Sequence, residues 1–263
     1  MAIIVPKRKH DDAERKKISD KYFQEIISIF PDMAGKRVLE IGTSAGDLTA
    51  RLAGDIGCEV VGIDVMSYPN WSIIQDKYPS VRLVHGDISV DLQDIPENYF
   101  DYIISFVVWE HIRHPWSALS NCQRLLKPTG KKFIRANLYR SAIASHLYSR
   151  ISDPWPHLMH SPEEIAERLN IKEIGWAFWC NKLTYQQYLF YFRKLGFYIT
   201  REKLYRNGYY NKQFYDKNEK KLGLYPDWDL RTDFFELVLE FDRDFPKQPV
   251  EDPVYRYLKK DHY

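Results

Sequence analysis

A turn with two glycines could bring the main chain close to a ligand. The segment Val38-Leu39-Glu40-Ile41-Gly42-Thr43-Ser44-Ala45-Gly46-Asp47 runs from an apolar strand into this turn and then into a helix. Gly42 and Gly46 have no Cβ, so a bound molecule can approach the backbone there. The sequence therefore predicts a binding site where the first strand ends.

Acidic residues follow the next two apolar runs. Val60-Val61-Gly62-Ile63-Asp64 ends one predicted strand, and Val84-His85-Gly86-Asp87-Ile88 ends the next. An ionised carboxylate only accepts hydrogen bonds and can bind both hydroxyls of a ribose. Open α/β sheets bind ligands at the carboxyl ends of their strands, where both acids would lie. The alternative for each acid is local bonding of the turn after its strand.

The glycine turn also matches two other patterns in part. The dinucleotide pattern G-x-G-x-x-G fails twice, because Ser44 replaces its second glycine and Asp47 its third. Gly42 to Gly46 fits the G-x-S-x-G nucleophile elbow of hydrolases, but an elbow normally follows several earlier strands, and this turn ends the first. The sequence therefore disfavours a nicotinamide or flavin site and a serine hydrolase.

Over residues 36–136 the chain resembles the class I S-adenosylmethionine-dependent methyltransferases. Their first motif, E-x-G-x-G-x-G, is matched by Glu40, Gly42 and Gly46, with Ser44 at the remaining glycine. A small residue at that position still allows close approach. The segment 100–112 resembles the family's stretch FDxIxSxxVxEH. The resemblance implies a single methyltransferase domain over residues 1–263 and S-adenosylmethionine as its cofactor.

The resemblance also assigns contacts with the cofactor. Asp64 would bind the ribose hydroxyls, Asp87 would accept a hydrogen bond from the adenine amino group, and Ile88 would pack on the adenine ring. The residues placed at the cofactor are Glu40, Gly42, Thr43, Ser44, Gly46, Asp64, Val65, Gly86, Asp87, Ile88, Ser105 and Phe106.

Fewer residues could act on the methyl acceptor. The sulfonium of the cofactor is already activated, so a base matters only if the acceptor is a hydroxyl. His111 follows the fourth strand, and histidine is a common general base, while its alternative role is to cap the next helix with Glu110. Within Asp153-Pro154-Trp155-Pro156-His157, we expect Asp153 and His157 to contact the acceptor, with loop-stabilising bonds as the alternative.

The stretch after the fifth strand is rich in histidine and aromatic residues. No metal is predicted, because His146, Asp153, His157 and His160 contain no pair of histidines at i, i+4 spacing. The aromatic residues of this stretch could stack on a sugar or planar acceptor, or simply pack; they are Tyr139, Tyr148, Trp155, Trp176 and Trp179. Residues 154–158 weakly resemble methyltransferases of surface-glycan and secondary-metabolite pathways.

Alternating strand and helix patterns must position these residues in a doubly wound, mostly parallel, seven-stranded Rossmann-like α/β sheet. The expected strands are 37–41, 59–64, 81–85, 102–108, 132–135, 197–204 and 234–241, the last one antiparallel. Helices are expected over 46–54, 72–78, 117–126 and 184–195. The expected regions are an N-terminal helix (11–31), a cofactor core (36–136), a substrate-cover insertion (137–183), a closing helix with two strands (184–242) and a peripheral tail (243–263).

Composition narrows the function classes. The net charge of +2 comes from 38 basic and 36 acidic residues, and no patch for nucleic acid stands out. Cys58, Cys122 and Cys180 suggest neither disulfides nor zinc, which favours a cytoplasmic location. The longest apolar stretch, 102–109, is less than half a membrane span, so no membrane insertion is expected. The sequence does not predict an oligomeric state.

The sequence thus predicts methyl transfer to a small-molecule acceptor, with a hydroxyl of a sugar, glycan precursor or secondary metabolite favoured. Two alternatives stay open: an N-methyltransferase of a small molecule, and a catalytically silent methyltransferase-like partner subunit. A nucleic-acid methyltransferase is disfavoured, because no Asn/Asp-Pro-Pro-Tyr/Phe motif follows the fourth strand.

Overall fold

A seven-stranded sheet in the order β3-β2-β1-β4-β5-β7-β6 forms the centre of the computed structural model, which describes residues 12–144, 147, 150–171, 181–206, 208, 210–242 and 244. The strands are β1 (Arg37–Ile41), β2 (Glu59–Asp64), β3 (Val81–His85), β4 (Phe100–Phe106), β5 (Leu126–Asn137), β6 (Phe197–Arg206) and β7 (Thr232–Phe241). The pairs among β1 to β5 are parallel, and β7 runs antiparallel to both β5 and β6. The predicted doubly wound, mostly parallel sheet is confirmed.

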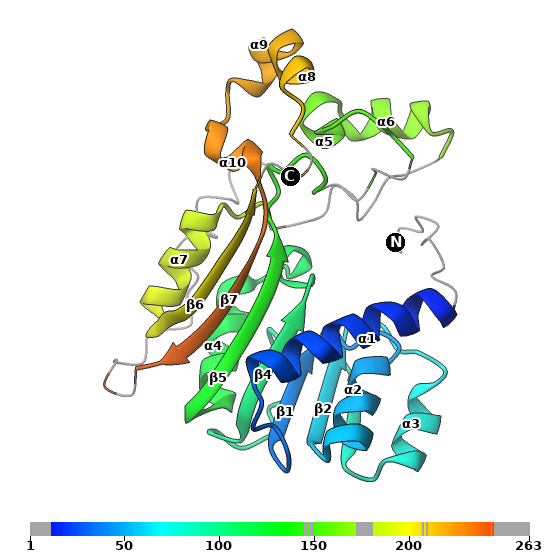
Figure 1. Cartoon of the computed structure of the whole chain (residues 1–263), viewed down its shortest axis with the longest axis vertical. Helices are drawn as coiled ribbons and strands as arrows, with labels where there is room; N and C mark the ends of the chain where they lie inside the picture. Colours follow the sequence, from blue (N-terminus) through cyan, green and yellow to red (C-terminus); the bar gives the residue numbers. More distant parts are fainter. Residues whose placement is uncertain are drawn as a thin grey trace.

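Helices cover both faces of this sheet (Figure 1). One face carries α1 (Asp12–Ile29), α2 (Asp47–Arg51) with its continuation η1 (Leu52–Ile56), and α3 (Trp71–Lys77). The other face carries α4 (Pro115–Leu125), which the short turn η2 (Trp109–His111) precedes, and α7 (Tyr185–Lys194). Two separate hydrophobic clusters lie on the two sides. The central strands are therefore buried on both faces, which explains their almost continuous apolar sequences.

The fifth strand is longer than the sequence predicts. Residues 127–130 read as the end of a helix, because Pro128 and Gly130 usually terminate one. In the structure they belong to β5, and the register jumps from Phe100 opposite Leu126 to Tyr102 opposite Lys131. This bulge accommodates the extra residues, and it leaves Pro128 exposed and free of the sheet's hydrogen-bond ladder.

A small cap lies beyond the carboxyl end of β5 (Figure 1). Two of its helices follow β5, namely α5 (Pro156–Met159) and α6 (Pro162–Arg168), and three lie between β6 and β7, namely α8 (Lys212–Lys217), α9 (Glu219–Leu222) and α10 (Asp227–Arg231). The fully buried Trp155 joins the two halves by packing on Tyr210 and Phe214. The sequence predicted only the first half, so the second half is a correction to the expected closing region.

Some expectations lie outside the described residues. These are His146, Tyr148, Trp176, Trp179, Cys180 and all of the 243–263 tail except Asp244. The expected N-terminal helix is present as α1, and Cys58 and Cys122 are buried free thiols. Within the described part of the chain, no helix is both long enough and apolar enough to span a bilayer.

Candidate active site

The turn after β1 has the left-handed backbone that its glycines predict. The φ angles are 77° at Gly42, 50° at Ser44 and 85° at Gly46. The N–H groups of Gly42 and Thr43 both donate to the carbonyl of Ile63 at the end of β2, at 2.8 and 3.2 Å. The turn therefore curls back toward β2 and lies at the carboxyl edge of the sheet.

A protein segment occupies the space beside Gly42. A Cβ at this position would lie 2.2 Å from the Cγ2 of Val108, which is far inside van der Waals contact. Val108 lies in the turn after β4, and β4 is the direct neighbour of β1, with Ser105 opposite Ile41. The absence of a side chain at Gly42 thus lets the β4 turn pack onto the turn after β1.

The departure from the family motif at Ser44 is accommodated by hydrogen bonds. Its N–H donates to Oδ2 of Asp64 at 2.9 Å, and its carbonyl accepts from Nε1 of Trp71 at 2.8 Å. Asn70 donates in turn to the carbonyl of Ala45. These contacts stabilise a left-handed serine where the family has glycine, so the turn keeps its shape without a third glycine.

Asp64 has local partners and spare hydrogen-bonding capacity. Its Oδ2 accepts from Ser44 N and its Oδ1 from Met66 N, both at 2.9 Å. An ionised carboxylate has about four acceptor sites, so roughly two remain for a ligand. Beside it, Val65 and Met66 expose 67% and 47% of their surface. An acceptor group next to exposed apolar side chains suits a ligand with both a ribose and a flat base.

The turn after β3 is tight and internally bonded. The N–H of Asp87 donates to Oδ2 of Asp91 at 2.6 Å, and Oδ1 of Asp87 accepts from Ser89 N at 2.8 Å. Ile88 is buried in the core on the α4 side of the sheet. The β2–β3 register places Asp64 opposite His85, so the turn at Gly86 follows directly beside Asp64. The two predicted acids therefore end neighbouring strands at one edge.

Glu40 lies beneath the glycine turn. Its Oε2 accepts from the hydroxyl of Thr43 at 3.2 Å and from the hydroxyl of Thr49 on α2. Burial raises the pKa of Glu40 to about 8, although both hydroxyl contacts favour the charged form. Glu40 thus supports the turn from inside. One of its two partners, Thr49, was not among the residues that the sequence predicted.

The raised pKa of Glu40 predicts a pH-dependent stability. The carboxyl group ionises near pH 4.5 in the unfolded chain and near pH 8 in the folded one. Its contribution to stability is complete below pH 4.5 and is lost as the pH rises toward 8. We expect Glu40→Gln to raise the free energy of unfolding near pH 8.5 by on the order of 3 kcal/mol and to change it little near pH 4.5.

Thermal unfolding at both pH values checks this prediction, with the exposed Glu167→Gln as the matched control. Glu167→Gln should leave the melting temperature unchanged at either pH. A Glu40→Gln variant that shifts the melting temperature equally at the two pH values would show that Glu40 does not cause the pH dependence.

The end of β4 contributes Ser105 and Phe106. Ser105 is buried, and its hydroxyl has no hydrogen-bond partner within the described part of the chain. Phe106 stacks on Tyr22 of α1 with ring centroids 4.2 Å apart, and it also packs on Phe133 at 4.9 Å. Phe106 therefore lies under α1, and its predicted contact with the cofactor stays a prediction.

The three predicted catalytic residues lie in two places. His111 ends η2, and its N–H donates to the carbonyl of Val108 at 2.8 Å, so it lies just after the segment that packs on Gly42. His157 and Asp153 belong to the cap. His111 thus follows Val108, the residue that packs on the glycine turn, by three positions. Its role as a base stays a prediction.

His157 and Asp153 make contacts that stabilise the cap. His157 is buried, with its Nε2 2.6 Å from the carbonyl of Tyr139 and its ring 5.0 Å from the Tyr139 ring. Asp153 pairs with Arg168 of α6 at 3.1 Å. The loop-stabilising alternative is therefore present for both residues, and their contact with an acceptor stays a prediction. Among the described residues, no group of three His, Cys, Asp or Glu side chains could hold a metal ion.

Sequence reasoning missed a buried ion cluster beneath α1. Arg135 of β5 donates through Nε to Glu236 of β7 at 2.9 Å and also binds Glu25 of α1. The rings of Tyr22, Phe106 and Phe234 surround its guanidinium within 5.9 Å. Glu25 is 110 residues and Glu236 is 101 residues from Arg135 in the chain, so no local sequence pattern could predict these pairs. Through the contact between Arg135 and Glu25, the cluster links α1 to the carboxyl half of β5.

Glu110 is a second group whose environment the sequence did not predict. Its Oε1 accepts from Nδ2 of Asn137 at the end of β5, at 2.7 Å. Its carbonyl accepts from Asn181 N at 2.8 Å, and Asn181 Nδ2 donates to the carbonyl of Trp109 at 2.6 Å. Burial raises the pKa of Glu110, opposed by the nearby charge of His111.

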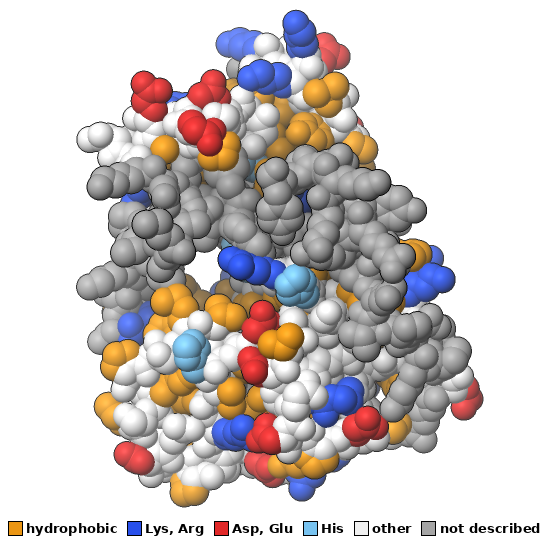
Figure 2. Space-filling view, turned by 180° about the vertical axis from the view of Figure 1, so that it is seen from behind, with side chains coloured by type: hydrophobic (Ala, Val, Ile, Leu, Met, Phe, Trp, Pro, Cys, Tyr) orange, Lys and Arg blue, Asp and Glu red, His pale blue; other side chains and the backbone are white. Residues whose placement is uncertain are grey.

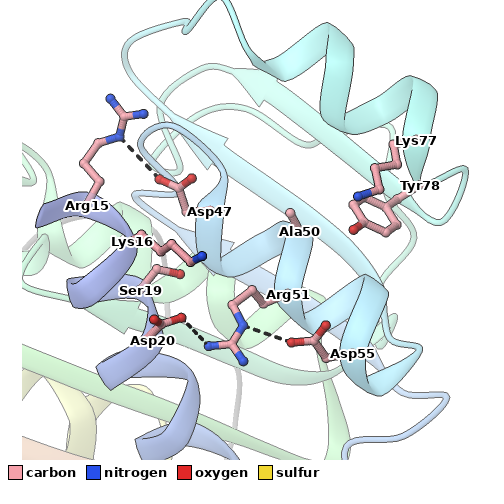
Figure 3. A pocket seen from close by; sticks show the side chains of 10 residues that line it. All are labelled: Arg15, Lys16, Ser19, Asp20, Asp47, Ala50, Arg51, Asp55, Lys77 and Tyr78. Carbon is pink, nitrogen blue, oxygen red and sulfur yellow. Dashed lines mark hydrogen bonds and ion pairs between the residues drawn. The ribbon is translucent and has the colours of Figure 1, made fainter. Parts of the chain in front are cut away.

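The surface has two hollows of different character. On the side opposite to that of Figure 1, hydrophobic, basic, acidic and histidine side chains of the described residues lie along the lower border of an opening (Figure 2). A pocket of about 670 Å³ lies between α1, α2 and the end of α3 (Figure 3). In it Arg15 pairs with Asp47, and Arg51 pairs with Asp20 and Asp55. Because this pocket lies among the helices, it is distinct from the strand-end turns.

Comparisons with known proteins agree with the fold. Residues 39–134 match the family described as a methyltransferase domain. The ubiquinone biosynthesis O-methyltransferase of Nitrosococcus oceani is 33% identical over 111 residues, which cover 41% of this chain and 47% of that protein. The chain thus spans about half the length of the curated relatives it matches.

Two solved structures share the fold at low sequence identity. Phosphoethanolamine N-methyltransferase 2 of Haemonchus contortus, bound to S-adenosylhomocysteine, superposes with a TM-score of 0.57 at 15% identity, over 89% of this chain and 59% of that one. Geranyl diphosphate C-methyltransferase of Streptomyces coelicolor A3(2) gives 0.57 at 11% identity, over 90% and 86%. These likenesses concern the sheet and its covering helices.

The sheet order and the three strand-end turns define a class I methyltransferase fold. The match over residues 39–134 places a methyltransferase domain over this part of the chain.

Proposed function

We propose that this chain transfers a methyl group from S-adenosylmethionine to a small polar acceptor, and that the accepting atom is a hydroxyl oxygen of a sugar, glycan precursor or secondary metabolite. The observation that carries the proposal is the alignment of the glycine turn, Asp64 and Asp87 at the carboxyl ends of three adjacent parallel strands. All three lie within the residues that match the family.

The residues present fit this cofactor. Asp64 keeps spare acceptor sites for the ribose hydroxyls. The exposed side chains of Val65 and Met66 offer an apolar surface for adenine. Within the turn, Ser44 is exposed and Gly42 is half-buried, so the main chain there would face the methionine part. When bound, the cofactor supplies a methyl group that its sulfonium has already activated.

The remaining tasks of the chain are to orient the acceptor and to exclude water. We assign the exclusion of water to the 137–183 insertion together with α8, α9 and α10; the described helices of both parts lie beyond the carboxyl end of β5. Within the insertion, His157 and Asp153 would face the acceptor, while His111 would lie on the opposite side near the glycine turn. We further propose a small-molecule partner, no nucleic acid, and a cytoplasmic location.

An N-methyltransferase remains the second candidate. The relatives above are named as O-, N- and C-methyltransferases, so one sheet serves different accepting atoms. The acidic group of Glu110 near the glycine turn would suit an amine as well as a hydroxyl. The third candidate is a catalytically silent subunit that binds and stabilises a partner protein.

Transfer of a labelled methyl group distinguishes these candidates. We expect the chain, incubated with methyl-labelled S-adenosylmethionine and separate pools of sugars, phenols and amines, to label a hydroxyl-bearing pool. If the label is found only in amines, the accepting atom is nitrogen and the proposed hydroxyl oxygen is wrong. Binding of the cofactor without transfer to any pool would favour the silent subunit and contradict the proposed enzyme.

A further inference from the structure

One buried carboxylate oxygen near the glycine turn has no partner in the described part of the chain. Glu110 exposes 3% of its surface. Its Oε1 accepts from Asn137, whereas its Oε2 is buried without a hydrogen bond. A buried polar atom left without a partner costs free energy, so its retention needs a reason. A ligand that donates a hydrogen bond to Oε2 would supply one.

The place of Glu110 in the fold points to the reacting atoms. Val108, two residues earlier, packs against Gly42 in the turn after β1. Asn137, which binds the carboxylate, ends β5, the strand beside β4. Across the same space, α1 brings Tyr22, whose pKa is raised by burial first and partly by the charge of Glu110. Glu110 therefore lies between the cofactor turn and the end of β5, under α1.

The main chain around Glu110 is held on both sides. Asn181 donates its N–H to the carbonyl of Glu110 and its side-chain amide to the carbonyl of Trp109. Together with Asn137, these bonds fix the carboxyl group before any acceptor arrives. Pre-orientation of this kind is what a proton-accepting group requires.

We infer that Glu110 takes up the proton of the acceptor group during methyl transfer. The inference rests on the proposed function. The acceptor oxygen forms a bond to the methyl carbon while the carbon–sulfur bond breaks and its electron pair stays on sulfur. The O–H proton moves to Oε2 of Glu110 and is later released to water. Such a site selects acceptors that carry a donor hydroxyl or amine, and it disfavours carboxylates by charge repulsion.

The groups around Glu110 agree with this role. His111 lies next to it on the same turn, the charge of Glu110 contributes to the raised pKa of Tyr22 on α1, and Arg135 of β5 pairs with Glu25 and Glu236. The neutral amide of Asn137 donates to the carboxylate, and burial raises the pKa of Glu110, opposed by the charge of His111. A carboxylate of raised pKa is a stronger base than an exposed one.

The affinity ratio of two cofactor analogues tests the inference without an acceptor. Sinefungin carries a carbon with an ammonium group where S-adenosylmethionine carries its sulfur with the methyl group, and S-adenosylhomocysteine carries a neutral sulfur with no such substituent. We expect Glu110→Gln to weaken sinefungin binding about 10-fold or more, as for a lost bond to a charged group, and to leave S-adenosylhomocysteine binding unchanged. The wild-type preference for sinefungin should fall as acidification protonates Glu110.

Calorimetric titrations at matched pH give these affinities. The exposed Glu167→Gln serves as the control, and it should change neither affinity. Glu110→Asp, which keeps the charge but shortens the side chain, should lose part of the sinefungin preference. An unchanged ratio in Glu110→Gln, or an equal loss for both analogues, would overturn the inference. If the wild-type chain binds neither analogue, the proposed function fails first.

Discussion

Replacement of Asp64 by alanine is expected to weaken S-adenosylhomocysteine binding by about 10-fold to 100-fold, because the ribose hydroxyls lose a charged acceptor. The same change removes the acceptor for the N–H groups of Ser44 and Met66, so the glycine turn also loosens. Both effects act in the same direction on affinity. Titration calorimetry measures the change directly.

Two further variants separate the causes. Asp76→Ala alters an exposed acid on neighbouring α3 and should leave the affinity unchanged. Asp64→Asn keeps an oxygen acceptor of the same size and should retain more affinity than Asp64→Ala. If Asp64→Ala binds S-adenosylhomocysteine as tightly as the wild type, the assignment of Asp64 to the ribose is wrong.

Arg135→Met is expected to lower the free energy of unfolding by about 3 to 5 kcal/mol, the usual cost of breaking a buried ion pair from one side. The substitution leaves Glu236 buried without its partner and releases Glu25 of α1. The aromatic rings around the guanidinium lose packing as well. Urea unfolding measures the loss.

Arg168→Met provides the matched control for this prediction. The pair between Arg168 and Asp153 is half exposed on both sides, so its loss should cost less than about 1 kcal/mol. The double variant Arg135→Met, Glu236→Gln should recover part of the stability, since it removes one stranded charge. Equal costs for Arg135→Met and Arg168→Met would show that the cluster beneath α1 contributes no special stability.

The cofactor half of the fold could be predicted because its signals are local. The strands β1, β2 and β3 have the predicted bounds, since each is a short apolar run that ends at a turn or an acid. The predicted site residues directly follow these three strands in the sequence. Because β1, β2 and β3 are neighbours in the sheet, these residues lie side by side at its edge. The bulge in β5 escaped prediction because Pro128 and Gly130 end helices more often than they occur inside strands.

The acceptor half depends on contacts between distant segments. The 208–231 part of the cap has short helices and many charged residues, so it lacks the periodic apolar pattern that predicts an element. Its place is fixed by packing on Trp155, which comes from the other half of the cap. The environments of Glu110 and Arg135 depend on burial and on distant partners. Asn137 binds Glu110 and Glu25 binds Arg135, and residue spacing in the sequence predicts neither contact.

Titration of the wild-type chain with S-adenosylhomocysteine, followed by a separate titration with NADH, shows which cofactor the strand-end turns bind. The turn at Gly42, Asp64 and Asp87 should give saturable one-to-one binding of S-adenosylhomocysteine and no binding of NADH. Binding of NADH without binding of S-adenosylhomocysteine would show that these turns do not form a methyltransferase site.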